Sequence, residues 1–276
     1  MICFPNAKIN LGLNIVEKRS DGFHNIETVF YPINWCDALE AIENKQYKKG
    51  DEKLNLTTSG IFIGNNTKDN LICKAYNLLD TKYKLPPIIS HLQKAIPMGA
   101  GLGGGSADAA FFIKLVNEKF TLNLSIEEQI NFAKQLGSDC AFFIENKAVF
   151  ASSKGDVFTE AQVDLSTYHI VVVYPAAHSN TAEAYKGIIP TKPKHHIQTI
   201  LSSDIKTWKN DLVNNFEKAI FIRYPEIEKV KNTLYNKGAL YAAMSGSGSA
   251  VYGVFEKDIA VEEFDFPANY LTWNSK

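Results

Sequence analysis

The chain has 276 residues, of which 45% are hydrophobic and 21% are charged. This composition is typical of globular proteins and excludes wholesale disorder, while the length favours two domains or one large one. The 29 lysine and arginine residues nearly balance the 30 aspartate and glutamate residues, so the formal net charge is -1. Because the chain carries no overall positive field, neither a nucleic acid nor an acidic membrane is expected as its main partner.

No apolar run approaches the ~18 residues of a membrane helix. Lys8 interrupts the N-terminal apolar stretch before the core of a signal peptide can form, so we predict a soluble, cytoplasmic protein. The four cysteines show neither C-x-x-C spacing nor a Cys/His ligand pattern. We predict reduced thiols and no metal site built from these residues, which are Cys3, Cys36, Cys73 and Cys140.

Residues 1 to about 60 are predicted to form short strands separated by turns. Ile9, Leu11 and Leu13 alternate with polar or small residues, which is the period of a half-buried strand. The tripeptide Ser20-Asp21-Gly22 then supplies the chemistry of a turn. This pattern predicts a hairpin or a β-meander at the start of the chain.

The middle of the chain mixes helix and strand signals. Apolar residues at helical spacing predict a helix from Asp69 to Leu79. A β-branched segment from Ile88 to Ile96 predicts a strand, which leads through a glycine cluster into a predicted helix from Ser106 to Leu115. Ser125 and Glu128 have the spacing of a capping box, so a further helix is expected to start at Ser125.

A linker-like stretch at residues 152–156 separates this part from the second half of the chain. The elements predicted around it are strands at 148–151 and 169–174, helices at 208–222 and 227–235, and strand-like runs on both sides of 246–248. Strands at the N-terminus follow one another instead of alternating strictly with helices, which favours an α+β architecture over a doubly wound parallel sheet. We predict two domains, residues 1–154 and residues 155–276.

A glycine-rich loop is the most informative segment, with five glycines in seven positions just before a helix start. Its sequence is Pro97-Met98-Gly99-Ala100-Gly101-Leu102-Gly103-Gly104-Gly105-Ser106. Glycine lets backbone amides converge without hindrance from Cβ, and a helix N-terminus adds unpaired N–H groups and the positive end of the helix dipole. The natural ligand is a phosphate. A flexible connector is the simpler alternative, but this loop joins two apolar elements.

Two known phosphate-binding patterns can be compared with this loop. The Walker A pattern requires a lysine before the closing serine or threonine, and Gly105 occupies that position. The G-x-G-x-x-G pattern is met by Gly99, Gly101 and Gly104, but a dinucleotide fold also needs an opening βαβ unit and an acidic residue ~20 positions further on. Here the loop follows a meander, so dinucleotide redox chemistry is the weaker alternative.

Three separated blocks resemble the motifs of the GHMP superfamily of small-molecule kinases, which includes galactokinase, homoserine kinase, mevalonate kinase and phosphomevalonate kinase. The blocks are Asn6 to Leu11, Pro97 to Ala110, and Ser245-Gly246-Ser247-Gly248. Their order and spacing also match, and the resemblance covers nearly the whole chain. It implies a two-domain α+β fold, with an N-terminal domain like ribosomal protein S5 domain 2 and a C-terminal ferredoxin-like α/β sandwich.

Further segments resemble one branch of this superfamily, whose acceptor is 4-diphosphocytidyl-2-C-methyl-D-erythritol. These segments are Arg19, Asp21-Gly22-Phe23-His24, Asp69-Asn70-Leu71-Ile72, the glycines 103–105, and Leu136-Gly137-Ser138-Asp139. The branch phosphorylates the 2-hydroxyl of this cytidine diphosphate-linked methylerythritol in non-mevalonate isoprenoid precursor biosynthesis, with ATP and Mg²⁺. The chain departs from the usual motifs at Asn6, where proline is usual, and at Phe23, where tyrosine is frequent.

The resemblance implies a role for each matching residue. Asp139 would accept the proton of the acceptor hydroxyl, and Lys8 would stabilise the developing alkoxide. Asn10 would border the acceptor, Phe23 and Tyr185 would sandwich its cytosine, and His24 would read the base edge. The residues implied in nucleotide binding are Pro97 to Ser106 of the loop, Ala107, and the adenine-side residues Asn70, Leu71, Ile72 and Lys94. Ser106 could add its hydroxyl to a phosphate or to Mg²⁺.

Four of these residues also have a plainer interpretation. Lys8 could be a solvated surface charge, Asp139 a carboxylate in the first turn of a helix, Phe23 a core residue and Tyr185 a surface tyrosine. Two other functions stay open at this point: another kinase of the same superfamily, of the mevalonate or homoserine type, and a catalytically silent metabolite sensor. The turn from Asp21 to His24 argues against the first, and retention of both Lys8 and Asp139 argues against the second.

Overall fold

The structure is a computed structural model, and it describes residues 1–64, 69–177, 179, 181–186, 188–258 and 264–275. The chain folds into two compact units. Unit 1 consists of Met1–Ala7, Asn34–Met98 and Gly103–Asn146, and unit 2 consists of Lys8–Ile33, Gly99–Leu102 and Lys147–Lys276. The chain therefore passes between the units several times. The predicted division at residue 154 stays a prediction, and each unit is described by itself.

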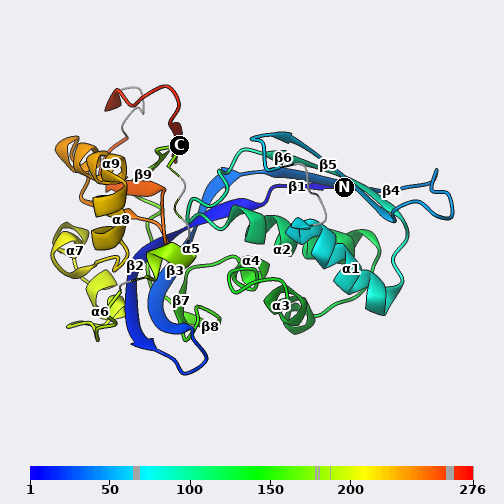
Figure 1. The fold of residues 1–276 in the computed structure, drawn as a ribbon, viewed down its shortest axis with the longest axis horizontal. Coiled ribbons are helices and arrows are strands. Elements are labelled where there is room, and N and C mark those ends of the chain that lie inside the picture. The colour runs from blue at the N-terminus through cyan, green and yellow to red at the C-terminus, as the bar shows by residue number, and fades with distance from the viewer. Residues whose placement is uncertain (65–68, 178, 180, 187, 259–263, 276) are drawn as a thin grey trace. The chain divides into compact units, whose positions relative to one another are not determined.

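Unit 1 contains a four-stranded sheet in the order β1-β4-β6-β5. Its strands are β1 (Ile2–Cys3), β4 (Ala38–Glu43), β5 (Leu54–Gly60) and β6 (Ile88–Lys94). The neighbours are antiparallel except for the parallel pair β5 and β6. The helices of this unit are α1 (Leu71–Tyr83), α2 (Gly104–Lys119), α3 (Ile126–Lys134) and α4 (Phe142–Glu145). Figure 1 shows α1 and α2 along one face of this sheet.

Side-chain caps explain where two of these helices begin. Asn70 caps α1 by accepting the Ile72 N–H at 2.9 Å, so the helix starts at Leu71, two residues later than predicted. The capping box predicted at Ser125 and Glu128 is confirmed, because each side chain accepts the backbone N–H of the other residue.

Unit 2 contains two four-stranded sheets, in the orders β2-β3-β7-β8 and β10-β11-β9-β12. The strands of the first sheet are β2 (Asn6–Lys18), β3 (His24–Cys36), β7 (Val149–Ser152) and β8 (Val157–Glu160). The strands of the second sheet are β9 (His169–Tyr174), β10 (Tyr241–Met244), β11 (Val251–Phe255) and β12 (Leu271–Asn274). The helices of this unit are α5 (Thr181–Ala184), α6 (Ile197–Leu201), α7 (Ile205–Asp211), α8 (Glu217–Arg223) and α9 (Pro225–Asn236).

Strand β2 is buried on both faces, so the prediction of a half-buried strand is wrong. The apolar alternation is present, but the polar side chains Lys8, Asn10 and Asn14 are only 3%, 2% and 4% exposed. Buried polar groups require hydrogen-bond partners, and Lys8 and Asn10 find them inside the protein. The polar face of this strand is therefore an internal site and not a solvated surface.

The single helix predicted at 208–222 is wrong, because α7 and α8 are separated by an extended segment. Within that segment Asn214 forms an isolated parallel bridge with Leu13 of β2. The Leu13 N–H donates to Val213 O at 2.8 Å, and the Asn215 N–H donates to Leu13 O at 2.8 Å. Pairing with β2 replaces the helical hydrogen bonds of this segment, which local periodicity does not reveal.

The second sheet of unit 2 is covered by α9, whose residues Val230 and Leu234 belong to the same apolar cluster as Val171 of β9 and Val251 of β11. The helix begins at Pro225, close to the predicted start.

Among the residues that the structure describes, no helix is both long enough and apolar enough to cross a membrane.

Candidate active site

The Lys8 side chain is held inside unit 2 by two oxygen atoms. Its Nζ donates to Asn10 Oδ1 at 2.6 Å and to the carbonyl oxygen of Gly101 at 2.9 Å. The ammonium also lies 5.0 Å from the centre of the Phe30 ring, within the range of a cation–π contact. The interpretation of Lys8 as a solvated surface charge is therefore wrong. Its charge is fixed against the glycine loop.

Thr28 sets the orientation of the Asn10 amide. The Thr28 hydroxyl donates to Gly12 O at 2.5 Å, so its oxygen can accept the Asn10 Nδ2 group at 2.9 Å. With Nδ2 turned toward Thr28, Oδ1 faces Lys8. The Lys8 backbone adds a further tie to the loop, because its N–H donates to Leu102 O at 2.9 Å.

The glycine loop needs glycine at defined positions. Gly99, Gly101 and Gly103 have φ of 64°, 78° and 74°, in the left-handed region that residues with a Cβ rarely adopt. At Gly101 a Cβ would lie 1.9 Å from the Ser245 carbonyl oxygen, which is closer than any real contact. The backbone of the loop therefore approaches the 245–248 turn directly within unit 2.

The helix α2 that follows the loop starts at Gly104, with the N-cap Gly103 offering no side-chain acceptor and no acidic residue in the first turn. The first N–H groups of this 16-residue helix thus receive no cap from a side chain. A Cβ on Gly105 would meet only Met98 Sδ at 4.0 Å, so the space beside this residue is open. Free amides beside open space at a helix N-terminus suit the phosphates of a nucleotide.

Asp139 lies in unit 1, in the turn between α3 and α4, and is partly exposed. The next residue, Cys140, is buried. Burial raises the pKa of its thiol to about 11, while a hydrogen bond with the Ser106 side chain acts in the opposite direction. This contact brings the segment of Asp139 beside the first turn of α2. Lys8 belongs to the other unit, so its pairing with Asp139 stays a prediction.

The aromatic residues predicted to bind cytosine are partly gathered in unit 2. The rings of His24 and Tyr185 stack with centroids 4.7 Å apart and an interplanar angle of 18°. Tyr185 also contacts Phe216 edge to face at 4.9 Å. Phe23 is 60% exposed, with Lys154 Nζ 5.2 Å from its ring centre. His24 is therefore the ring that stacks on Tyr185. The prediction instead places Phe23 and Tyr185 on the two faces of the cytosine.

Lys94 occupies a different environment from the one predicted. Its side chain is 0% exposed and lies between two carboxylates, at 2.9 Å from Asp108 Oδ2 and in direct hydrogen-bond contact with Asp37. Asp37 also accepts the N–H groups of Ala95 and Ile96 at 2.6 and 2.9 Å. Lys94 thus belongs to a buried ionic cluster of unit 1, and a nucleotide contact by its ammonium stays only a prediction.

The pKa of Asp108 is shifted by its place in this cluster. Burial raises its pKa to about 7, with Lys94 lowering the pKa and Asp37 raising it. Its Oδ1 atom is buried without a hydrogen-bond partner. The two carboxylates and one ammonium carry an excess negative charge, which a proton on Asp108 relieves.

Two of the predicted adenine-side residues serve the start of α1. Asn70 uses its side-chain oxygen as the helix cap, and Ile72 is fully buried. No role was predicted from the sequence for Thr28, Asp37, Asp108, Asn214 or the side chain of Ser245. Ser245 and Asp108 lie within motifs recognised in the sequence, but the contact that each of the five residues makes joins it to a residue at least 14 positions away along the chain, which a local pattern does not reveal.

Comparison with known proteins identifies the family of this chain. The family model described as GHMP kinases N terminal domain matches residues 70–147, and that described as GHMP kinases C terminal matches residues 197–265. A 4-diphosphocytidyl-2-C-methyl-D-erythritol kinase of Bacteroides fragilis is 50% identical over 270 residues, covering 98% of this chain and 97% of that protein. The Bacteroides thetaiotaomicron protein of the same name is 47% identical and covers 100% of both chains.

A solved structure supports the same relationship. The crystal structure of a 4-(cytidine 5'-diphospho)-2C-methyl-D-erythritol kinase matches with a TM-score of 0.84 and 26% identity, covering 99% of this chain and 98% of that one. The chain therefore belongs to the GHMP kinases and, within them, to the family of 4-diphosphocytidyl-2-C-methyl-D-erythritol kinases. It is an ATP-dependent small-molecule kinase, and the predicted α+β GHMP kinase fold is confirmed.

Proposed function

We propose that this protein transfers the γ-phosphoryl group of ATP to the 2-hydroxyl of 4-diphosphocytidyl-2-C-methyl-D-erythritol, in non-mevalonate isoprenoid precursor biosynthesis. The observation that carries this proposal is the buried Lys8 ammonium, held against the glycine loop by Gly101 O and Asn10 Oδ1. The relatives that share 47 to 50% of its residues over nearly the full chain carry the name of this reaction.

The chemistry assigns one task to each group. The acceptor oxygen forms a bond to the γ-phosphorus while the bond to the β–γ bridging oxygen breaks, so ADP leaves. Asp139 takes the proton of the acceptor hydroxyl. Lys8, already fixed in place, stabilises the negative charge that develops on the acceptor oxygen without having to reorganise during the reaction.

The nucleotide is proposed to lie on the loop from Pro97 to Ala107, with its phosphates on the free amides at the start of α2. Mg²⁺ is the proposed cofactor. No group of three or more His, Cys, Asp or Glu side chains suited to a metal occurs in the described residues. Mg²⁺ is usually bound by substrate phosphates and water with one or two protein ligands. The Ser106 hydroxyl, in the first turn of α2, is the proposed protein contact to Mg²⁺ or to a phosphate.

The acceptor side is proposed to include Asn10, Phe23, His24 and Tyr185. Phe23, more than half exposed, offers a ring face to the cytosine, and stacking on aromatic rings tolerates any base. Selectivity for cytosine then falls to a hydrogen-bonding group, for which His24 is the proposed residue. A small-molecule substrate, a cytoplasmic location and domains at 1–154 and 155–276 complete the proposal.

The test is ADP release by the purified protein with ATP and Mg²⁺. Turnover should be highest with the cytidyl acceptor and much lower with its uridyl analogue. Mevalonate, homoserine and galactose serve as competing acceptors of the superfamily. If the protein preferred any of these three, that compound would be the acceptor and the proposal would be wrong. ATP binding without turnover of any acceptor would indicate a metabolite sensor.

A further inference from the structure

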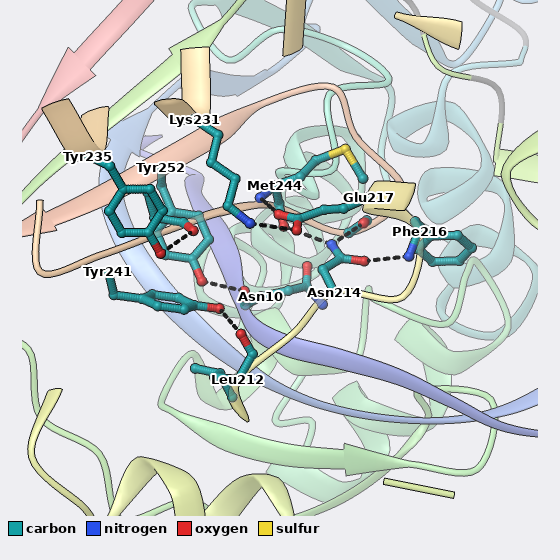
Figure 2. Close-up of polar contacts among 12 residues, drawn as sticks. Asn10, Leu212, Asn214, Phe216, Glu217, Lys231, Tyr235, Tyr241, Met244 and Tyr252 are labelled. Atoms are coloured by element: carbon teal, nitrogen blue, oxygen red, sulfur yellow. Dashed lines mark hydrogen bonds and ion pairs between the residues drawn. The ribbon is translucent and has the colours of Figure 1, made fainter. Parts of the chain in front are cut away.

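One asparagine of unit 2 uses its side-chain NH2 group to hold the residues on both sides of Ser245. Asn214 Nδ2 donates to the carbonyl oxygens of Met244 and Gly246, both at 2.8 Å. Its Oδ1 accepts the Phe216 N–H at 3.0 Å, and the residue is only 4% exposed. Figure 2 shows Asn214 among these partners. Both amide hydrogens are thus committed to the residues on either side of Ser245.

Ser245 connects this clamp to the partners of Lys8. Its hydroxyl donates to Gly101 O at 2.8 Å and lies 3.3 Å from Asn10 Oδ1, while its oxygen accepts the Asn10 N–H at 3.2 Å. Gly101 O and Asn10 Oδ1 both accept hydrogen bonds from the Lys8 ammonium. A shift of Ser245 would therefore move the acceptors of Lys8.

Glu217 and Tyr252 make further contacts in the same region (Figure 2). Glu217 Oε1 accepts the Met244 N–H at 2.9 Å, and its Oε2 pairs with Lys231 Nζ at 2.6 Å. The Tyr252 hydroxyl donates to the backbone oxygen of Asn10 at 2.7 Å. The turn and the strand that carries Lys8 are thus held in one largely buried hydrogen-bond network.

We propose that Asn214 is a positioning residue for the reaction, acting through Ser245 on the placement of the Lys8 ammonium. The break between α7 and α8 makes this possible. It lets the backbone at Asn214 pair with Leu13, which lies on the same strand as Lys8, while the side chain holds the turn. One residue therefore fixes the turn relative to the strand. The inference rests on the proposed function, in which Lys8 serves catalysis.

The competing explanation is that Asn214 only stabilises the fold, as any buried asparagine with three hydrogen bonds would. Tyr235 offers a matched control. Its hydroxyl donates to Ala242 O at 3.2 Å, a backbone carbonyl of the same strand β10 that precedes the turn, but it has no link to Ser245. Tyr235→Phe removes one partly buried hydrogen bond to β10 and leaves the partners of Lys8 unchanged.

The test compares Asn214→Asp, Ser245→Ala and Tyr235→Phe in the full-length protein. Asn214→Asp keeps the size and the acceptor for Phe216 but removes both donors to the turn. Two quantities are measured beside the melting temperature: kcat with the cytidyl acceptor, and the rate at which acetic anhydride labels Lys8, followed by peptide mass spectrometry. The labelling rate reports the placement and protection of Lys8 without any assumption about the reaction.

We expect Asn214→Asp and Ser245→Ala to lower kcat by ~10- to 100-fold, because small displacements of a catalytic group have effects of this size, while KM for ATP changes by less than ~3-fold. Lys8 labelling should become at least ~5-fold faster in both variants, as expected from local opening around a protected amine. Tyr235→Phe should leave both quantities within ~2-fold of wild type, even where its melting temperature falls equally.

Unchanged Lys8 labelling in folded Asn214→Asp would overturn the inference, as would equal effects of Tyr235→Phe at equal loss of melting temperature. Where Asn214→Asp fails to fold, Ser245→Ala decides alone: unchanged labelling and kcat reject the inference, and altered values support it. A wild-type protein without turnover of the cytidyl acceptor, but with the expected labelling pattern, would reject the proposed function and leave the placement of Lys8 by Asn214 standing.

Discussion

Replacing Asp108 by asparagine would neutralise one of the two carboxylates that flank the buried Lys94 ammonium. The substitution keeps the size of the side chain, so packing around α2 should change little. In the folded protein burial raises the pKa of Asp108 to about 7 from its ordinary value of 3.8. Asp37, Lys94 and Cys3 are titratable groups close to Asp108. Burial raises the pKa of the Cys3 thiol to about 12.

The sign of the effect follows from linkage. When folding raises the pKa of a carboxyl group, the protonated group stabilises the folded state. This stabilisation is complete below the pKa of the unfolded state and is lost as the pH rises through the pKa of the folded state. The stability of the wild type should therefore fall, relative to Asp108→Asn, between pH 5 and pH 8. Since one pKa unit corresponds to ~1.4 kcal/mol, the loss should be on the order of 2 kcal/mol over this interval.

The assay is urea unfolding of both proteins at several pH values from 5 to 8, with the free energy of unfolding compared at each pH. Asp80→Asn serves as the control, because it removes a carboxylate from a half-exposed pair with Lys53 in the same unit. The difference between Asp108→Asn and wild type should grow with pH in favour of the variant. A difference that stays constant within ~0.5 kcal/mol would show that the Asp108 carboxyl does not titrate in this interval.

Three further predictions concern the proposed reaction. Lys8→Met and Asp139→Asn should each lower kcat by ~10²- to 10⁴-fold with little change in ATP affinity, and turnover within ~3-fold of wild type in either folded variant would reject the proposed pair. Gly105→Val should weaken ATP binding measured by calorimetry, because its side chain would enter the open space beside the free amides; an unchanged affinity would move the phosphates elsewhere. His24→Ala should lower kcat/KM for the cytidyl acceptor by ~5- to 150-fold while ATP affinity is retained. Equal losses for both ligands, or an unchanged preference for cytidyl over uridyl acceptor, would argue that His24 supports the fold and does not read the base.

Several features were predictable from the sequence because their causes are local. The capping box at Ser125 and Glu128 depends on residues three positions apart, and the structure has it as predicted. The glycine density at 99–105 just before a helix start predicted backbone amides that converge without hindrance from Cβ, and the structure has left-handed backbone at Gly99, Gly101 and Gly103 and no side-chain cap on the helix. Recognition of the kinase family rested on three such local motifs, and the comparisons confirm it.

Tertiary contacts decided what local patterns could not. The alternation in β2 predicted its apolar residues correctly. The burial of its polar residues depends on distant partners: Gly101 lies 93 residues from Lys8, and Thr28 and Ser245 lie 18 and 235 residues from Asn10. The same reason explains the break between α7 and α8, where pairing with a strand about 200 residues earlier replaced the helical bonds expected from periodicity.

The sequence by itself determined the class of the protein and the residue types of its chemistry: the glycine loop, a lysine on the first long strand and an aspartate before α4. Only the tertiary structure decided the environment of each charge. Lys8 and Lys94 are both lysines on strands near the loop. Within its own unit Lys8 donates to a side-chain amide and a backbone carbonyl, whereas Lys94 lies between two carboxylates. The pKa and reactivity of a charged group depend on its neighbours and its solvation, which are provided by segments that are distant in the sequence.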